Sequence, residues 1–294
     1  MDDPARTSWA RVRKVVRAML GSKPARDDDP VPRLGVSPRL VGILVLITLA
    51  AGTADVWLSR RARESAGQTG PGTAQPTVPD GSDSHPAVPV IPPDPYLNVV
   101  AEAVVPTVPV FSYPGSRRPS QRLKSPSEHG VPLVFLVREE RGQWLKVLLP
   151  VRPNGSKGWI RRKDISISHH RYRIAVLLKS HRLLASEGGD IFLRARIAVG
   201  TENTPTPGGT YYIKELLKPP NPNTVYGTYA YGLSGFSNVL TSFNGGEGVI
   251  GIHGTNDPSV LGKDVSAGCI RMRNRDIEKL VKVLPLGTPV EIIR

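Results

Sequence analysis

The chain has 294 residues, a formal net charge of +14 and a single cysteine. One cysteine excludes an internal disulfide, and 29 prolines with 29 glycines favour turns, linkers and strands over long helices. Residues 96–294 carry 27 Lys and Arg against 15 Asp and Glu, a net +12. These bases are scattered with few aromatic residues among them, which argues against a nucleic-acid-binding protein.

The N-terminal segment predicts a membrane anchor. Residues 1–39 are polar and basic, and Leu40–Leu58 is apolar apart from one aspartate. As a helix this span would be about 28 Å long, enough to cross the hydrocarbon core of a membrane. Nine bases precede it and three follow closely, which predicts a cytoplasmic N-terminus. The alternative is a cleaved signal peptide, but the leading segment is long and no clean Ala-x-Ala site follows.

Residues 59–95 predict a linker. Eight prolines and no aromatic residue lie within residues 64–95, so this segment cannot bury enough apolar surface to fold. We therefore expect a single-pass cell-membrane protein whose remaining residues lie outside the cytoplasm.

Residues 96–168 predict a small all-β domain. Leu133–Val137 and Gln143–Leu149 form a predicted hairpin, joined by a charged turn. An Asn-Gly turn at Asn154 precedes another short strand at Trp159. The "GQWLKV…GWI" pattern resembles bacterial SH3-like β-barrels, which often bind the cell wall. A simple packing spacer is the alternative.

Residues 173–294 are again rich in predicted strands. "RIAVLLKSHRLL" and "IFLRARIAVG" are typical of two consecutive strands joined by Glu187–Asp190, and the second alternates apolar and polar residues. "GVIGIHG" predicts a strand ending at His253. "NRDIEKLVKVL" predicts one helix with Asn274 as its N-cap, and "GTPVEIIR" predicts a final strand.

The only cysteine, Cys269, follows His253 by sixteen residues across a loop rich in Gly, Pro, Asp and Ser. A nearby imidazole can form an ion pair with a thiolate and so lower the pKa of the thiol. Gly268 permits unusual backbone geometry, and N–H groups at such a turn can form an oxyanion hole. Arg271 lies two residues beyond the cysteine, where it could bind a carboxylate. The alternative is an inert buried thiol beside a structural histidine.

The motifs "HGT…SAGCIRM", "TPTPGGTYYI", "NRDIEKL" and "GTPVEI" occur in an order that resembles the YkuD-type L,D-transpeptidase catalytic domain over Arg173–Arg294. The resemblance implies a mostly β, sandwich-like fold with one C-terminal helix. It implies cysteine acyl transfer from a peptidoglycan tetrapeptide stem to a neighbouring stem amine, giving a 3→3 cross-link. No metal or other cofactor is implied, and carbapenems acylate this family.

The same resemblance implies a role for each residue of the motif. Cys269 would be the nucleophile and His253 the base, while the carbonyl of Gly254 would orient the imidazole. The backbone of Gly268 and Cys269 would contribute to the oxyanion hole. The side chains of Ser266 and Arg271 would line the substrate site. One departure is Ala267, which stands where many members have a second histidine, so the side-chain contact that this histidine would make is missing from the motif.

A segment rich in Tyr and Gly, Asn223–Asn238, precedes the strand of the predicted base. Its aromatic residues, Tyr229 and Tyr231 above all, are predicted to line a peptide groove, with packing into the sheet as the alternative. His169, His170 and His181 lack metal-ligand spacing and are interpreted as surface residues.

Several activities stay open. Water or a protein amine as acceptor would make the chain an L,D-carboxypeptidase or a stem-to-protein transferase, and a non-catalytic wall-binding scaffold is the alternative from another class. The His-to-Cys interval disfavours a sortase, and the order disfavours a papain-like peptidase. The diamino acid at stem position three and the oligomeric state do not follow from the sequence.

Overall fold

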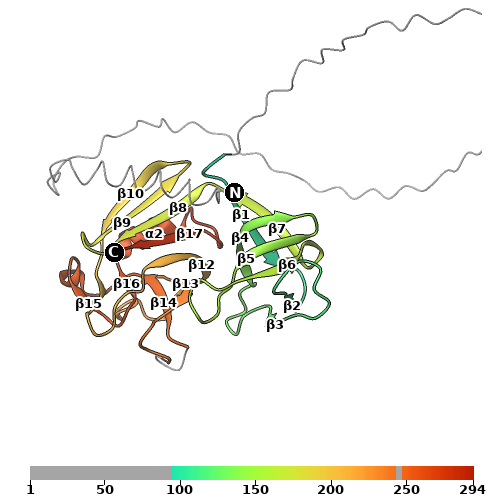
Figure 1. Cartoon of the computed structure of the whole chain (residues 1–294). Coiled ribbons are helices and arrows are strands. Elements are labelled where there is room, and N and C mark those ends of the chain that lie inside the picture. Colours follow the sequence, from blue (N-terminus) through green and yellow to red (C-terminus); the bar gives the residue numbers. More distant parts are fainter. Residues whose placement is uncertain (1–93, 243–246) are drawn as a thin grey trace, which may run out of the picture. The chain divides into compact units, whose positions relative to one another are not determined.

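The computed structural model describes residues 94–242 and 247–294, and Figure 1 shows how their elements are arranged. These residues all fall within one compact unit. The predicted tail, the predicted span Leu40–Leu58 and nearly all of the predicted linker lie outside the described residues. Within the described ranges, no helix is both long and apolar enough to cross a membrane.

The first part of the described chain, residues 98–170, is here called the small module. It consists of seven strands and one 3₁₀ turn: β1 (Asn98–Ala103), β2 (Thr107–Val110), β3 (Gln121–Lys124), β4 (Val134–Arg141), β5 (Trp144–Leu148), β6 (Lys157–Arg161), η1 (Arg162–Asp164) and β7 (Ile165–His170). Five of these strands form an antiparallel sheet in the order β6-β5-β4-β1-β7, and β2 and β3 pair with each other.

The predicted hairpin is present as β4 and β5, but its boundaries differ from the prediction. Residues 138–141, predicted as a charged turn, continue β4, and Arg141 pairs with Trp144. The prediction failed because charged side chains on the exposed side of a strand have the same composition as a turn. Apolar side chains from the other side form a separate buried cluster that includes Ala101, Phe135 and Leu145.

The second part, residues 172–293, contains the large sheet. Its elements are β8 (Tyr172–Leu177), β9 (Arg182–Glu187), β10 (Asp190–Arg196), β11 (Val199–Gly200), β12 (Gly209–Leu217), β13 (Ala230–Phe236), β14 (Val249–His253), η2 (Pro258–Val260), β15 (Asp264–Ser266), β16 (Ile270–Arg271), α2 (Asn274–Val281) and β17 (Pro289–Ile293). Eight strands form one curled, half-barrel sheet in the order β10-β9-β8-β17-β12-β13-β14-β16, and β11 pairs with β15. The strands expected in a sandwich are thus hydrogen-bonded as one continuous large sheet.

Two expectations for this part need correction. The stretch "RIAVLLKSHRLL" is two strands, β8 and β9, because the chain turns before His181, whose φ of 52° is unusual for a residue other than glycine. Helix α2 begins at Asn274, and its N-cap is Arg273, which makes no side-chain capping bond. The Asn274 side chain instead accepts hydrogen bonds from the backbone of Thr228 and Thr255.

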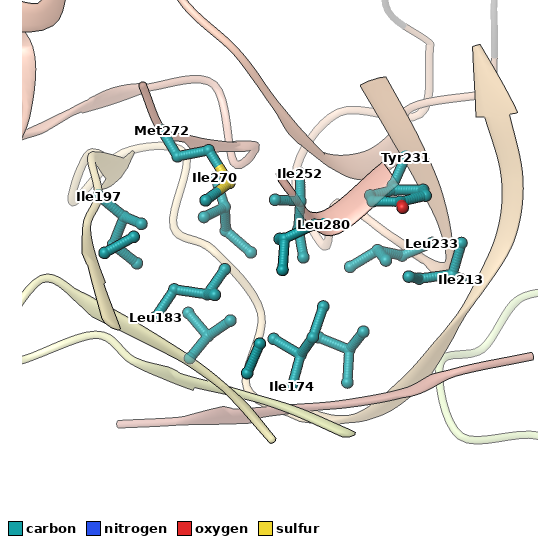
Figure 2. Packing of buried hydrophobic residues seen from close by; sticks show 14 of the residues in the cluster. Ile174, Leu183, Ile197, Ile213, Tyr231, Leu233, Ile252, Ile270, Met272 and Leu280 are labelled. Carbon is teal, nitrogen blue, oxygen red and sulfur yellow. The ribbon is translucent and has the colours of Figure 1, made fainter. Parts of the chain in front are cut away.

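The core of the large sheet lies between the strands and α2. Figure 2 shows side chains from many strands meeting there with Leu280 of the helix, and the cluster contains Ile174, Leu183, Ile197, Ile213, Leu233, Ile252, Ile270 and Met272. All of these are buried. Because Ile252 of β14 and Ile270 of β16 both point into this core, the side chains next to them in sequence face the opposite side.

The small module and the large sheet share a buried contact. Tyr212 of β12 is buried among Val100, Val134, Leu136 and Leu148, and its hydroxyl donates to the carbonyl of Val134 at 3.0 Å. Polar contacts extend this interface. Arg152 donates to three backbone carbonyls, at Ser237, Leu240 and Glu247, over 2.7 to 3.0 Å. The loop between β5 and β6 therefore fixes both ends of the connection between β13 and β14.

Candidate active site

Cys269 and His253 are brought together by parallel pairing of β14 with β16. Ile252 is paired with Ile270, and His253 is paired with Arg271. Since the isoleucines face the core, His253 and Arg271 face the opposite side of the sheet. Cys269 directly precedes β16, and its thiol lies against the backbone of Gly251 in β14. Residues separated by sixteen positions in the sequence thus face one site.

His253 is held by the residue that follows it. Its Nδ1 lies 2.7 Å from the carbonyl oxygen of Gly254. A carbonyl only accepts, so Nδ1 carries the proton and Nε2 of a neutral ring keeps its lone pair. The orienting contact implied for Gly254 is therefore present in the geometry, and the backbone of Val225 also contacts the ring.

Burial controls the charge state of both groups. It lowers the pKa of His253 to about 4, with Arg271 adding to the shift and the carbonyls of Gly254 and Val225 opposing it. Burial also raises the pKa of Cys269, against the backbone of Gly251 and the charge of Arg271. Within residues 94–242 and 247–294, no hydrogen bond joins the Cys269 thiol to the His253 ring.

These directions correct the expected thiolate–imidazolium pair. A raised thiol pKa and a lowered imidazole pKa both favour the neutral forms at pH 7. The resting site therefore holds a neutral thiol beside a neutral base.

Arg271 is the nearby positive charge. It lowers the pKa of both His253 and Cys269. Its main chain is fixed by two hydrogen bonds with Ala198, each 2.9 Å. Among the described residues its buried Nε has no hydrogen-bond partner, and the ion pair of Asp276 is with Arg275 at 3.8 Å. Asp276 therefore forms its ion pair with Arg275 and not with Arg271.

Ser266 and Gly268 shape the turn that presents the cysteine. The Ser266 hydroxyl donates to the carbonyl of Cys269 at 2.5 Å and accepts from the N–H of Gly268 at 3.1 Å. Ser266 is buried, so it holds the turn rather than lining an open surface. The Gly268 N–H is already engaged in this contact, which leaves the N–H of Cys269 as the predicted oxyanion donor.

The segment that contains the "TPTP" motif, residues 201–207, makes hydrogen bonds to this turn. Thr204 donates through its hydroxyl to the carbonyl of Ser266 at 3.0 Å, and Thr201 donates its N–H to the same carbonyl at 3.1 Å. The motif approaches so closely that a Cβ on Gly200 would lie 2.2 Å from the carbonyl oxygen of Thr204. These contacts hold the turn that presents Cys269.

The two tyrosines predicted to line a substrate groove, Tyr229 and Tyr231, have different environments in the structure. Tyr231 is 1% exposed within the core of the large sheet, so the prediction that it contacts substrate is wrong. Tyr229 is half-buried and packs against the same core, with the Lys218 ammonium 5.9 Å from its ring. Tyr226 is the aromatic residue at the site, because its ring lies 5.1 Å from the imidazole of His253.

Other contributors to the site are not apparent from the sequence, among them the backbone of Gly251 beside the thiol, the Thr204 hydroxyl and the Asn274 amide. The first acts through its backbone and the second through a common hydroxyl, and neither group forms a recognisable sequence motif by itself. The third was interpreted as a helix cap. In the described ranges, no three His, Cys, Asp or Glu side chains are grouped closely enough to hold a metal ion.

Residues 171–292 match the family model of YkuD, the L,D-transpeptidase catalytic domain. This part of the chain is a YkuD domain. The YkuD protein of Bacillus licheniformis is 41% identical over 121 residues, which cover 41% of this chain and 65% of that protein. The YkuD protein of Bacillus subtilis is 38% identical over 123 residues, covering 42% and 66%. The chain thus spans just under two thirds of the length of these relatives.

The YkuD domain also aligns with solved structures. A crystal structure of L,D-transpeptidase 3 from Mycobacterium tuberculosis, in complex with a faropenem-derived adduct, aligns over 49% of this chain and 76% of that chain. The sequence identity is 14% and the TM-score 0.34, so this likeness adds nothing to the argument from the site.

Proposed function

We propose that the chain is a peptidoglycan L,D-transpeptidase that forms 3→3 cross-links through a cysteine acyl-enzyme. One observation carries the proposal within the YkuD domain. His253 and Arg271 lie on the same side of two parallel-paired strands, Cys269 directly precedes the second strand, and the His253 Nδ1 lies against the Gly254 carbonyl. A nucleophile, a base and a cation for an anionic substrate thus share one site.

In the first half-reaction, the Cys269 Sγ attacks the carbonyl carbon of the third residue of a tetrapeptide stem. As the carbon–sulfur bond forms, Nε2 of His253 takes the thiol proton. The oxyanion of the tetrahedral intermediate is stabilised by the N–H of Cys269. The bond to the terminal D-alanine then breaks, and the imidazolium returns the proton to the leaving amine, which leaves a thioester.

In the second half-reaction, the amine of a neighbouring stem attacks the thioester carbonyl. His253 removes a proton from that amine, the new amide bond forms, and the carbon–sulfur bond breaks. The imidazolium then protonates the departing sulfur, which restores the neutral pair. Water or a protein amine in place of the stem amine would give hydrolysis or transfer to protein by the same steps.

Arg271 fits the recognition of an anionic group on the donor stem. Its buried Nε is without a protein partner among the described residues, and an N–H in that state favours a carboxylate ligand. A single guanidinium beside the nucleophile would orient the donor before attack.

The proposal includes the predicted architecture and location. Leu40–Leu58 anchors the chain with its N-terminus in the cytoplasm, and the YkuD domain acts in the cell wall or periplasm. Residues 96–168 form an SH3-like barrel that accompanies the catalytic domain built on the large sheet. The apolar span and the asymmetry of its flanking bases support this arrangement. Fractionation of cells should place the full-length chain in membranes, with residues 64–294 open to external protease. A soluble chain whose N-terminus lies near residue 55 would contradict it.

One incubation tests the reaction. The full chain in detergent is mixed with a disaccharide tetrapeptide, and the products are identified by mass spectrometry. A cross-linked dimer with loss of one D-alanine supports the transpeptidase. A tripeptide alone identifies a carboxypeptidase, and unchanged substrate supports a non-catalytic scaffold. The Cys269→Ala variant is the matched control.

A further inference from the structure

The side chain of Asn274 joins two loops behind the site. Its Oδ1 accepts the N–H of Thr255 at 3.1 Å and the N–H of Thr228 at 3.3 Å. The residue stands at the start of α2, but the helix takes Arg273 as its N-cap and no side chain caps it. The two hydrogen bonds therefore serve the loops and not the helix.

The bond to Thr255 continues to the imidazole through one peptide group. The Thr255 N–H and the Gly254 carbonyl belong to the same planar unit, so fixing one end fixes the other. That carbonyl accepts from Nδ1 of His253 at 2.7 Å. A chain of hydrogen bonds thus runs from the ring through Gly254 and Thr255 to the Asn274 amide, and such chains strengthen one another in a buried setting.

Packing around the amide oxygen leaves little freedom. A Cβ added to Gly254 would lie 2.1 Å from Oδ1 of Asn274, and one added to Gly227 would lie at the same distance. Real Cβ atoms do not approach so closely. Gly227 also has a φ of +63°, which glycine adopts readily. Two glycines thus form a slot that admits the amide oxygen and holds both loops against it.

The second loop touches the imidazole from another direction. Thr228 follows Tyr226 by two residues, and the Tyr226 ring lies 5.1 Å from the ring of His253. Asn274 therefore binds the two loops that carry two neighbours of the imidazole: the Gly254 carbonyl, which accepts from Nδ1, and the Tyr226 ring.

We propose that Asn274 is a positioning residue, which holds the His253 ring in its Nδ1-protonated tautomer through the Gly254–Thr255 peptide. It does not touch substrate. The inference rests on the proposed function only in taking His253 as the base; the positioning itself is a property of the folded chain. Loss of the amide frees the Gly254 carbonyl to rotate, and the imidazole then loses its fixed direction toward Cys269.

The test uses the full chain and three variants. Asn274→Ala removes the acceptor, whereas Asn274→Asp keeps an acceptor of the same shape. Arg275→Ala is the matched control, because Arg275 is the next residue of α2 and is exposed. Nitrogen-15 NMR of the imidazole, with the His253 signals identified from a His253→Gln variant, reports the tautomer directly. Alkylation of Cys269 by iodoacetamide and turnover of a tetrapeptide stem report the function of the base.

In wild type we expect a single Nδ1-protonated tautomer. In Asn274→Ala we expect mixed tautomers and a fall in kcat of about 10- to 100-fold with little change in KM, as for a reacting group displaced by a fraction of an ångström. Asn274→Asp should restore one tautomer and most of the rate, and Arg275→Ala should change neither. Should Asn274→Ala not fold, Asn274→Ser replaces it, since its hydroxyl is too short to reach both N–H groups.

An unchanged tautomer and unchanged kcat in the variant, even with lower thermal stability, would show that Asn274 only stabilises the fold and would overturn the proposal. Failure of the proposed function looks different. The wild type would then not turn over the stem, while the tautomer would still change in Asn274→Ala and recover in Asn274→Asp.

Discussion

A Cβ added to Gly142, in the turn between β4 and β5 of the small module, would meet no atom within 4 Å. One added to Gly254 of the large sheet would lie 2.1 Å from Asn274, and one added to Gly251 would lie 2.8 Å from the carbonyl oxygen of Tyr231. The first glycine serves only the shape of the backbone. The other two provide space, because backbone and side chains converge on them around His253 and Cys269.

The two regions also treat a histidine differently. His170 ends β7 of the small module and His253 ends β14, and burial lowers the pKa of each to about 4. His170 interacts with Asn98 and the backbone of Tyr172, both close to the strand that carries it. His253 is instead aligned by Gly254 beside a thiol. A similarly lowered pKa thus accompanies a structural role in one region and a proposed chemical role in the other.

The largest expected effect comes from the nucleophile. Cys269→Ser should lower stem turnover by more than about 10³-fold, because an alcohol is far harder to ionise than a thiol. Mass spectrometry should show one carbapenem added to Cys269 in wild type and none in the variant. Arg141→Ala, on the exposed surface of the small module, should leave acylation unchanged. A wild type that takes up no acyl group from stem or carbapenem would refute the catalytic interpretation.

The glycine comparison predicts the next largest effect. Gly254→Ala should reduce kcat by about 10²-fold, because the added methyl group displaces the Asn274 amide and with it the carbonyl that orients His253. Gly142→Ala has open space but a φ of +55°, so it should cost about 1 kcal/mol of unfolding free energy and no activity. Steady-state kinetics and chemical denaturation separate the two. Equal loss of activity in both variants would break the comparison.

The buried histidines predict a stability that falls in mild acid. The unfolded state takes up a proton near pH 6.5 and folded His253 only near pH 4. Stability is therefore complete above pH 6.5 and is lost as pH falls from about 6.5 to 4, by roughly 3 kcal/mol for His253. Urea denaturation between pH 4 and 7 measures it. His253→Gln should reduce this dependence, and His170→Gln should reduce it by a separate amount. A slope that survives both substitutions would place its origin elsewhere.

Substitution of Arg271 should lower turnover of the donor stem more than it lowers the reactivity of the Cys269 thiol. Arg271→Ala should lower kcat/KM for the tetrapeptide stem by about 10- to 100-fold, the value of one charged hydrogen bond. Alkylation by uncharged iodoacetamide should slow less, because only the small effect of Arg271 on the pKa of Cys269 is lost. A variant that loses folding stability and thiol reactivity to the same degree would indicate a structural role instead.

The smallest effect concerns the contact between the two regions. Arg152→Ala removes hydrogen bonds to three carbonyls and should destabilise the fold by about 1–2 kcal/mol. Arg162, whose exposed ion pair with Glu140 stays within the small module, is the control. Arg162→Ala should cost well below 1 kcal/mol, since exposed ion pairs contribute little. Thermal melting of both variants measures the two losses of stability. Equal losses would show that the contact between the two regions contributes no more than an exposed ion pair.

Periodicity was enough to predict the alternation in β10, the strand that ends at His253, and the apolar face of α2. It failed where a turn had no Gly or Pro signal. The break between β8 and β9 falls in Leu178–His181, where the chain reverses with a histidine at positive φ. The sequence pattern also wrongly predicted a turn at residues 138–141, because charged residues on the exposed face of a strand have the same composition as a loop.

Sequence alone determined the candidate chemistry: one cysteine, a histidine sixteen residues earlier and an arginine two residues later. Only the tertiary structure decided the charge states of these residues and the neighbours that hold them in place. Burial sets the pKa of His253 and Cys269 in opposite directions, and burial depends on the whole sheet. Likewise, Tyr231 lies in the core and Tyr226 beside the imidazole, and Asn274 acts on loops 19 and 46 residues away. Such contacts join segments that are distant in sequence, so no local pattern records them.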